Sequence, residues 1–103
     1  MPTYNKLVRD KIPKIIEQDG KKAKVTVLDD IEYHKCLINK LHEEVQEFIE
    51  SDDVEEIADI IEVIDSILKV KGITWSHIRD IQDNKRKKNG GFNKKYFLIS
   101  VEG

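Results

Sequence analysis

The chain has 103 residues, of which 39% are hydrophobic and 37% charged, so it suits one domain with a modest core. The net charge is only −2, and the single cysteine, Cys36, excludes an intramolecular disulfide. Because no apolar run approaches about 18 residues and no signal-peptide pattern opens the sequence, we expect a cytoplasmic protein without a membrane span.

The first part of the chain predicts two short elements. Pro13 is suited to the first turn of a helix that continues through Glu17, and Gly20 ends this helix. The β-branched run at 24–28 predicts a short strand.

Two long helices follow. Asp29 and Glu32 have the spacing of a capping box at the start of the first helix, and Ser51-Asp52-Asp53 separates it from a second helix at about 54–70. Apolar residues recur at helical spacing on both helices: Leu37, Ile38, Leu41, Val45, Phe48 and Ile49, then Ile57, Ile60, Ile61, Ile64, Ile67 and Leu68, with Ala58 and Val63 on the flanks. The short connection predicts an antiparallel helical hairpin.

The last part of the chain predicts one more helix, which starts at Thr74 or Ser76 and ends near Asn89. The run at 95–101 is strand-like, and we expect it to pair with 24–28 in a two-stranded β ribbon. The predicted fold class is therefore all-α, in a single domain 1–103. A hairpin would complete a four-helix bundle by forming a homodimer or homotetramer, with the short ribbon beside it.

Four carboxylates flank the two apolar stripes. Glu44 and Glu47 project about 60° apart on the first long helix, and Glu56 and Asp59 do the same on the second. Like charges held close together raise one another's pKa values unless a cation joins them. Mg²⁺ prefers oxygen ligands, and acids spaced i, i+3 on facing helices can build a metal site inside a bundle. The four positions therefore predict a divalent cation site.

The alternative for each acid is a solvated helix face or an ion pair, as between Lys40 and Glu44 at i, i+4. Glu43 points away from the apolar stripe, and Glu62 and Asp65 are secondary candidates as ligands. The histidines do not have the spacing of a zinc site: His34, His42 and His77.

At these residues the sequence resembles the MazG-like all-α nucleoside triphosphate pyrophosphohydrolases. The family pattern E-E-x-x-E stands here at 43–47, and E-x-x-D stands at 56–59. The opening from Tyr4 to Pro13 and the segment from Lys85 to Phe92 resemble a subgroup described as phosphoribosyl-ATP pyrophosphohydrolase-like. That subgroup often has Arg where this chain has Asn89.

The resemblance implies Mg²⁺-dependent attack of water on the α-phosphate, with Mn²⁺ as a substitute ion, in nucleotide-pool house-cleaning. It implies that the metal ligands and catalytic acids are Glu44, Glu47, Glu56 and Asp59. A triphosphate also needs cations, and the basic segments on either side of the acidic middle supply them. The candidate phosphate contacts are Lys6, Arg9, Lys11, Lys85 and Lys88.

Two other functions remain open from the sequence. One is hydrolysis of phosphoribosyl-ATP, which uses related chemistry on another substrate. The other is a non-catalytic helical interaction module that binds nucleic acid through the basic segment 85–95. We do not expect nucleic acid as a partner, because that segment is short and the chain carries 20 acidic residues.

Overall fold

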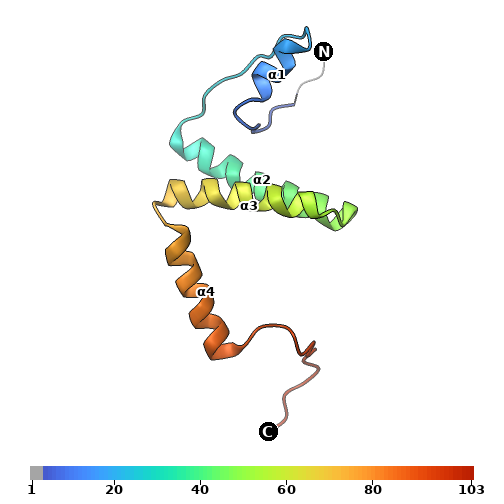
Figure 1. The fold of residues 1–103 in the computed structure, drawn as a ribbon, viewed down its shortest axis with the longest axis vertical. Coiled ribbons are helices and arrows are strands. Elements are labelled where there is room, and N and C mark those ends of the chain that lie inside the picture. The colour runs from blue at the N-terminus through green and yellow to red at the C-terminus, as the bar shows by residue number, and fades with distance from the viewer. Residues whose placement is uncertain (1–3) are drawn as a thin grey trace. The chain divides into compact units, whose positions relative to one another are not determined.

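The computed structural model describes residues 4–103, and the chain divides after Gly72 into two compact units. The described residues form no strand, and their helices are α1 (Ile12–Gln18), α2 (Asp30–Ser51), α3 (Val54–Lys71) and α4 (Trp75–Asn89) (Figure 1). The predicted all-α class is confirmed. None of these helices is both long enough and apolar enough to cross a membrane.

In the first unit, α2 and α3 form a hairpin whose ends are fixed by aspartates. The Asp29 carboxylate accepts a hydrogen bond of 2.8 Å from the backbone N–H of Glu32 and begins α2. Asp52, in the left-handed conformation at φ 53°, ends α2, and the Asp53 carboxylate accepts the N–H of Glu55 to begin α3. This two-residue connection reverses the chain, so that α2 and α3 lie side by side (Figure 1). The predicted hairpin is confirmed.

The core of this unit is small. It consists of Leu37 from α2 with Val63 and Ile67 from α3, and half-buried Leu7 packs against it together with residues of α2. Leu7 precedes α1, so the N-terminal segment is held against the hairpin by an apolar contact. This contact positions the basic residues that follow Leu7 in the sequence.

The apolar stripes are only partly buried. Val63, expected on the flank of α3, is 8% exposed, whereas Ile57 and Ile61 of the expected main face are 41% and 50% exposed. Because α3 is apolar around much of its circumference and packs mainly against α2, only one side of it is covered. The remaining apolar side is open in a single chain.

The predicted β ribbon is not seen. Neither 24–28 nor 95–101 is a strand, and Val27 and Phe97 are 95% and 89% exposed. A β-branched or aromatic run becomes a strand only when a partner supplies backbone hydrogen bonds and a packing surface. These two segments have neither, so their composition alone does not make them strands.

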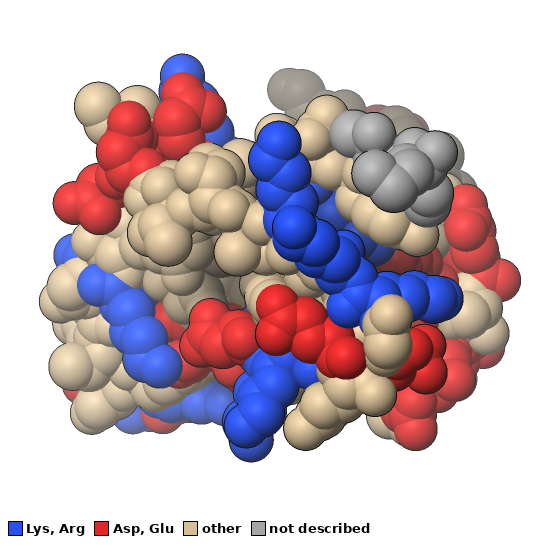
Figure 2. All heavy atoms as spheres, turned by 90° about the horizontal axis from the view of Figure 1, so that it is seen from above, with Lys and Arg blue, Asp and Glu red and all other residues tan. Residues whose placement is uncertain are grey.

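The second unit consists of α4 and the segment that follows it. The Thr74 hydroxyl accepts the N–H of His77 at 3.1 Å to begin α4, and Gly90 at φ 83° follows its last residue, as the sequence predicts. The last turn is basic, with Arg86, Lys87 and Lys88. Figure 2 shows that both acidic and basic side chains are present at the surface of the chain.

Candidate metal centre

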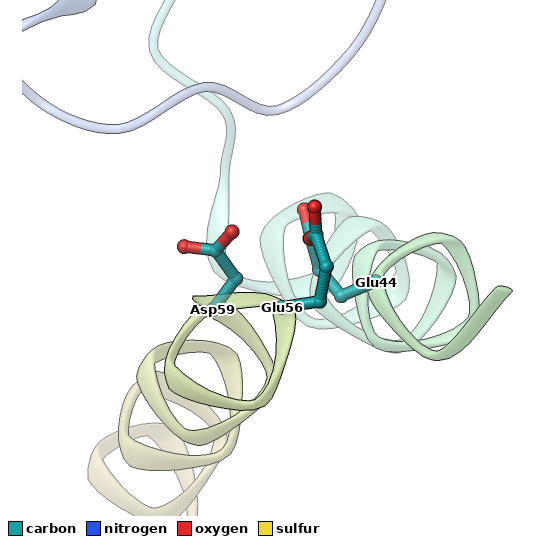
Figure 3. A group of neighbouring side chains, drawn as sticks. All are labelled: Glu44, Glu56 and Asp59. Atoms are coloured by element: carbon teal, nitrogen blue, oxygen red, sulfur yellow. The ribbon is translucent and has the colours of Figure 1, made fainter. Parts of the chain in front are cut away.

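Three carboxylates come together on the α2–α3 hairpin. Glu44 is contributed by α2, and Glu56 and Asp59 lie one turn apart on α3. Each offers one oxygen, and these oxygens all lie within 4.8 Å of one another. Figure 3 shows the three side chains rising on the same side of the hairpin. The spacing of i, i+3 on α3 and the reversal of the chain at Asp52 therefore bring together three of the four acids predicted from sequence.

The fourth predicted acid, Glu47, is a neighbour of the other three. It lies one turn after Glu44 on α2 and is exposed. A hydrogen bond and charge repulsion from Glu47 act on both Glu44 and Glu56. Glu47 thus lies at the open side of the cluster, in contact with water and with two of the inner carboxylates.

Burial and repulsion between carboxylates raise the pKa values of two of the clustered acids, Glu44 and Glu56. Glu44 is only 7% exposed, and its burial, followed by a hydrogen bond with Glu47, raises its pKa. Desolvation, followed by repulsion from Glu47, raises the pKa of Glu56 to about 7. The carboxyl groups of Glu44 and Glu56 therefore keep their protons to higher pH than ordinary glutamates do.

Two oxygens of the cluster lack a partner. The Oε2 atoms of Glu44 and Glu56 are buried and form no hydrogen bond. A buried polar atom without a partner destabilises a fold by roughly 1–3 kcal/mol, and few such atoms occur in a small domain. Both atoms belong to the three-residue cluster, where a bound cation would supply the partner that each of them lacks.

The chemistry of the cluster fits Mg²⁺. All its donors are carboxylate oxygens, which hard divalent cations prefer to nitrogen or sulfur. In an octahedral shell with ligands about 2.1 Å from Mg²⁺, neighbouring oxygens lie roughly 3 Å apart and opposite oxygens roughly 4 Å apart. The three oxygens, which lie within 4.8 Å of one another, would therefore draw closer together around a bound ion.

Two basic side chains contact the cluster. Lys40 Nζ lies 3.5 Å from Glu44 Oε1 and 3.4 Å from Glu43 Oε2, so Glu44 also forms the i, i+4 ion pair that was the alternative to a metal site in the sequence. Arg9 Nη2 lies 2.6 Å from Asp59 Oδ1. The contact of Arg9 with Asp59 has no signal in the sequence, because the two residues are separated by 50 positions and share no local pattern.

Of the other candidate phosphate contacts, Lys6 and Lys11 form no ion pair with the clustered carboxylates within residues 4–103. Lys6 lies 5.5 Å from the centre of the Tyr4 ring, and Lys11 is the exposed residue before α1. Lys85 and Lys88 lie on α4 in the second unit, both exposed. Their role in binding phosphate stays a prediction.

The secondary acidic candidates lie outside the three-residue cluster. Glu62 is exposed, and Asp65 pairs with Lys69 at 2.9 Å along the same face of α3. Asp65 therefore has a local partner and is not needed to explain the unpartnered oxygens.

Comparisons of the chain with protein-family models, with curated proteins and with solved structures found no match. A function for this chain therefore has to be inferred from its own residues. These are the carboxylate cluster, the basic side chains that contact it and the sequence motifs to which the acids belong.

Proposed function

We propose that this protein is a Mg²⁺-dependent enzyme that hydrolyses nucleoside triphosphates to nucleoside monophosphate and pyrophosphate, as part of nucleotide-pool house-cleaning. The observation that supports this most strongly is the cluster of Glu44, Glu56 and Asp59, in which two buried oxygens lack a partner. The motifs at 43–47 and 56–59 support the same reaction through their resemblance to MazG-like pyrophosphohydrolases.

The three clustered carboxylates would hold the cation, with Mn²⁺ as a substitute for Mg²⁺. When bound, the cation supplies positive charge that offsets the charge of the phosphate groups. In the reaction a water oxygen forms a bond to the α-phosphorus. The bond from the α-phosphorus to the bridging oxygen breaks, and pyrophosphate leaves with the electron pair.

We assign to Glu47 the role of orienting the attacking water molecule and accepting its proton. It is exposed beside the cluster, lies one turn from Glu44 and interacts with Glu56. From that position its carboxylate can orient a water molecule and take up its proton as the new P–O bond forms. Glu44 is buried and partly neutralised by Lys40, so it is better suited to ligation.

The basic residues supply charge for the triphosphate. Arg9 is already at the cluster through its contact with Asp59, and Lys6 and Lys11 belong to the same N-terminal segment. Lys85 and Lys88 add positive charge on α4. Cations of this kind stabilise the negative charge that develops on departing pyrophosphate.

A second copy of the chain would cover the open apolar side of the hairpin. The exposed apolar residues of α2 and α3 include Ile38, Val45, Ile49, Ile57 and Ile61. A hairpin with so small a core gains stability when two copies pack their apolar sides together as four helices. We therefore propose a homodimer or homotetramer, and a cytoplasmic location in keeping with the unpaired Cys36.

The test is an assay of pyrophosphate release by the purified full-length chain. Standard and non-standard nucleoside triphosphates and phosphoribosyl-ATP would be supplied with Mg²⁺, with Mn²⁺, or with a chelator. We expect one pyrophosphate per monophosphate and loss of turnover with the chelator. Faster turnover of phosphoribosyl-ATP than of every nucleoside triphosphate would favour the alternative substrate. Binding of RNA or DNA without any hydrolysis would favour the interaction module.

A further inference from the structure

Asp59 is both a candidate ligand for a divalent cation and the ion-pair partner of Arg9. It is one of the three carboxylates that offer oxygens to a divalent ion, and its Oδ1 atom already accepts a hydrogen bond of 2.6 Å from the Arg9 guanidinium. The side chains of Arg9 and Asp59 are 58% and 39% exposed. This pair is therefore a surface ion pair placed directly on a candidate metal ligand.

A surface ion pair of this kind is weak, because water screens it and both side chains lose freedom when they pair. A divalent cation carries twice the charge of a guanidinium and is held by several carboxylates at once. The two cations also repel each other when both sit on one carboxylate. A divalent ion that enters the cluster is thus expected to displace Arg9.

The displaced guanidinium cannot move far. Leu7, two residues earlier, packs against the core of the hairpin and anchors the N-terminal segment beside the cluster. A guanidinium presents several N–H donors in a plane and binds phosphate oxygens well, often in pairs. Once released from Asp59, Arg9 has a binding partner of the right chemistry only when a phosphate ligand is present.

We propose that Arg9 and the divalent cation are alternative partners of Asp59, so that cation binding releases the Arg9 guanidinium to the phosphate groups of the substrate. The inference rests on the proposed function for the identity of the cation and the substrate. Its consequence is an order of binding: the cation comes first, and the triphosphate then binds to a site in which Arg9 is available.

The exchange can be observed directly, because the chain has three arginines and therefore three guanidinium Nε–H signals in its NMR spectrum. Mg²⁺ alone should shift the signal of Arg9. Arg86, which pairs with Asp83 at 3.4 Å, and Arg79, which lies 5.6 Å from the centre of the Trp75 ring, should keep theirs. A non-hydrolysable α,β-methylene nucleoside triphosphate added afterwards should shift the Arg9 signal again.

A matched pair of variants tests the same exchange by affinity. Arg9→Gln should bind Mn²⁺ alone about two- to fivefold more tightly than the wild type, since no ion pair has to be broken. With Mg²⁺ saturating, the same variant should bind the methylene analogue at least about tenfold more weakly. Lys14→Gln removes an equal charge from an exposed residue of α1, and it should leave both affinities unchanged.

The opposing outcomes are distinct. An Arg9 signal that stays in place at saturating Mg²⁺, or Mn²⁺ binding by Arg9→Gln that is equal to or weaker than that of the wild type, overturns the exchange but leaves the metal site intact. Failure of the wild type to bind Mn²⁺ overturns the metal site and the proposed function as well. The NMR experiment uses the wild type, so it remains decisive even where Arg9→Gln loosens the N-terminal segment.

Discussion

Glu44 on α2 and Glu56 on α3 bring two buried carboxylate oxygens without hydrogen-bond partners to the same place on the hairpin. A fold optimised for stability alone would replace such a pair by apolar residues or by a single hydrogen-bonded group. The protein instead keeps both acids, with Lys40 beside Glu44 and with the pKa of Glu56 raised to about 7. Sites that give up stability in this way are characteristic of function.

Stability in the absence of a cation should fall as pH rises. The pKa of Glu56 is raised from 4.5 to about 7 in the folded chain, so between these pH values the folded state keeps a proton that the unfolded state releases. Proton binding therefore favours the folded state at the low end of this window, and that contribution is lost toward the high end. Thermal unfolding followed across the window measures this slope.

The same titration predicts how Mg²⁺ acts. Because the cation needs ionised carboxylates, its stabilising effect should be small near about pH 5 and large near about pH 8. At roughly 100 times the dissociation constant, the gain at the higher pH is about 2.7 kcal/mol, or roughly 10–20 °C in Tm. Glu56→Gln should flatten the pH slope without Mg²⁺. A gain from Mg²⁺ that is equal at both pH values would contradict a carboxylate site.

Glu47→Gln should abolish turnover while the fold survives. The amide keeps the size of the side chain but cannot take up a proton from water, so we expect pyrophosphate release to fall at least about 100-fold. Glu50→Gln is the matched control: Glu50 is also exposed on α2, and its hydrogen bond with Gln46 can be retained by an amide. Circular dichroism should show equal helix content in both. Wild-type turnover by Glu47→Gln would show that the site is assigned wrongly.

Glu44→Gln separates stability from metal binding. The change removes a buried charge from among Glu47, Glu56 and Asp59, so the variant should melt at a higher temperature than the wild type without Mg²⁺. Its affinity for Mn²⁺ should fall at least about tenfold, since a neutral amide is a poorer ligand for a hard cation. Calorimetry on the two proteins measures both effects. A lower melting temperature together with unchanged Mn²⁺ affinity would mean that Glu44 has a structural role through Lys40.

The open apolar side of the hairpin predicts self-association. Light scattering should give the mass of a dimer or tetramer at micromolar concentration, and Ile61→Asp should weaken association at least about 100-fold by placing a charge in the interface. Val27→Asp, at a residue 95% exposed outside the hairpin, is the control and should leave the mass unchanged. A wild-type monomer at that concentration would remove this part of the proposal.

The local features of this protein could be predicted from its sequence. The ends of the long helices follow from Asp29 and Gly72, because capping hydrogen bonds and a left-handed terminal residue involve only neighbours in the chain. The choice of the four candidate acids followed from their spacing, since residues at i and i+3 project from the same side of a helix. The short connection at Asp52 then predicted that the two sides meet.

The tertiary structure decided what depends on contacts between distant segments. It buried Glu44, which pairs with Lys40, and left Glu47 exposed, although both residues belong to one motif. It placed Arg9 on Asp59 through the packing of Leu7 on the hairpin core. Such contacts gain their free energy from surfaces that meet only after folding, so no local pattern encodes them. For the same reason the strand-like composition of 24–28 and 95–101 did not suffice, because a strand requires a partner that the chain does not supply there.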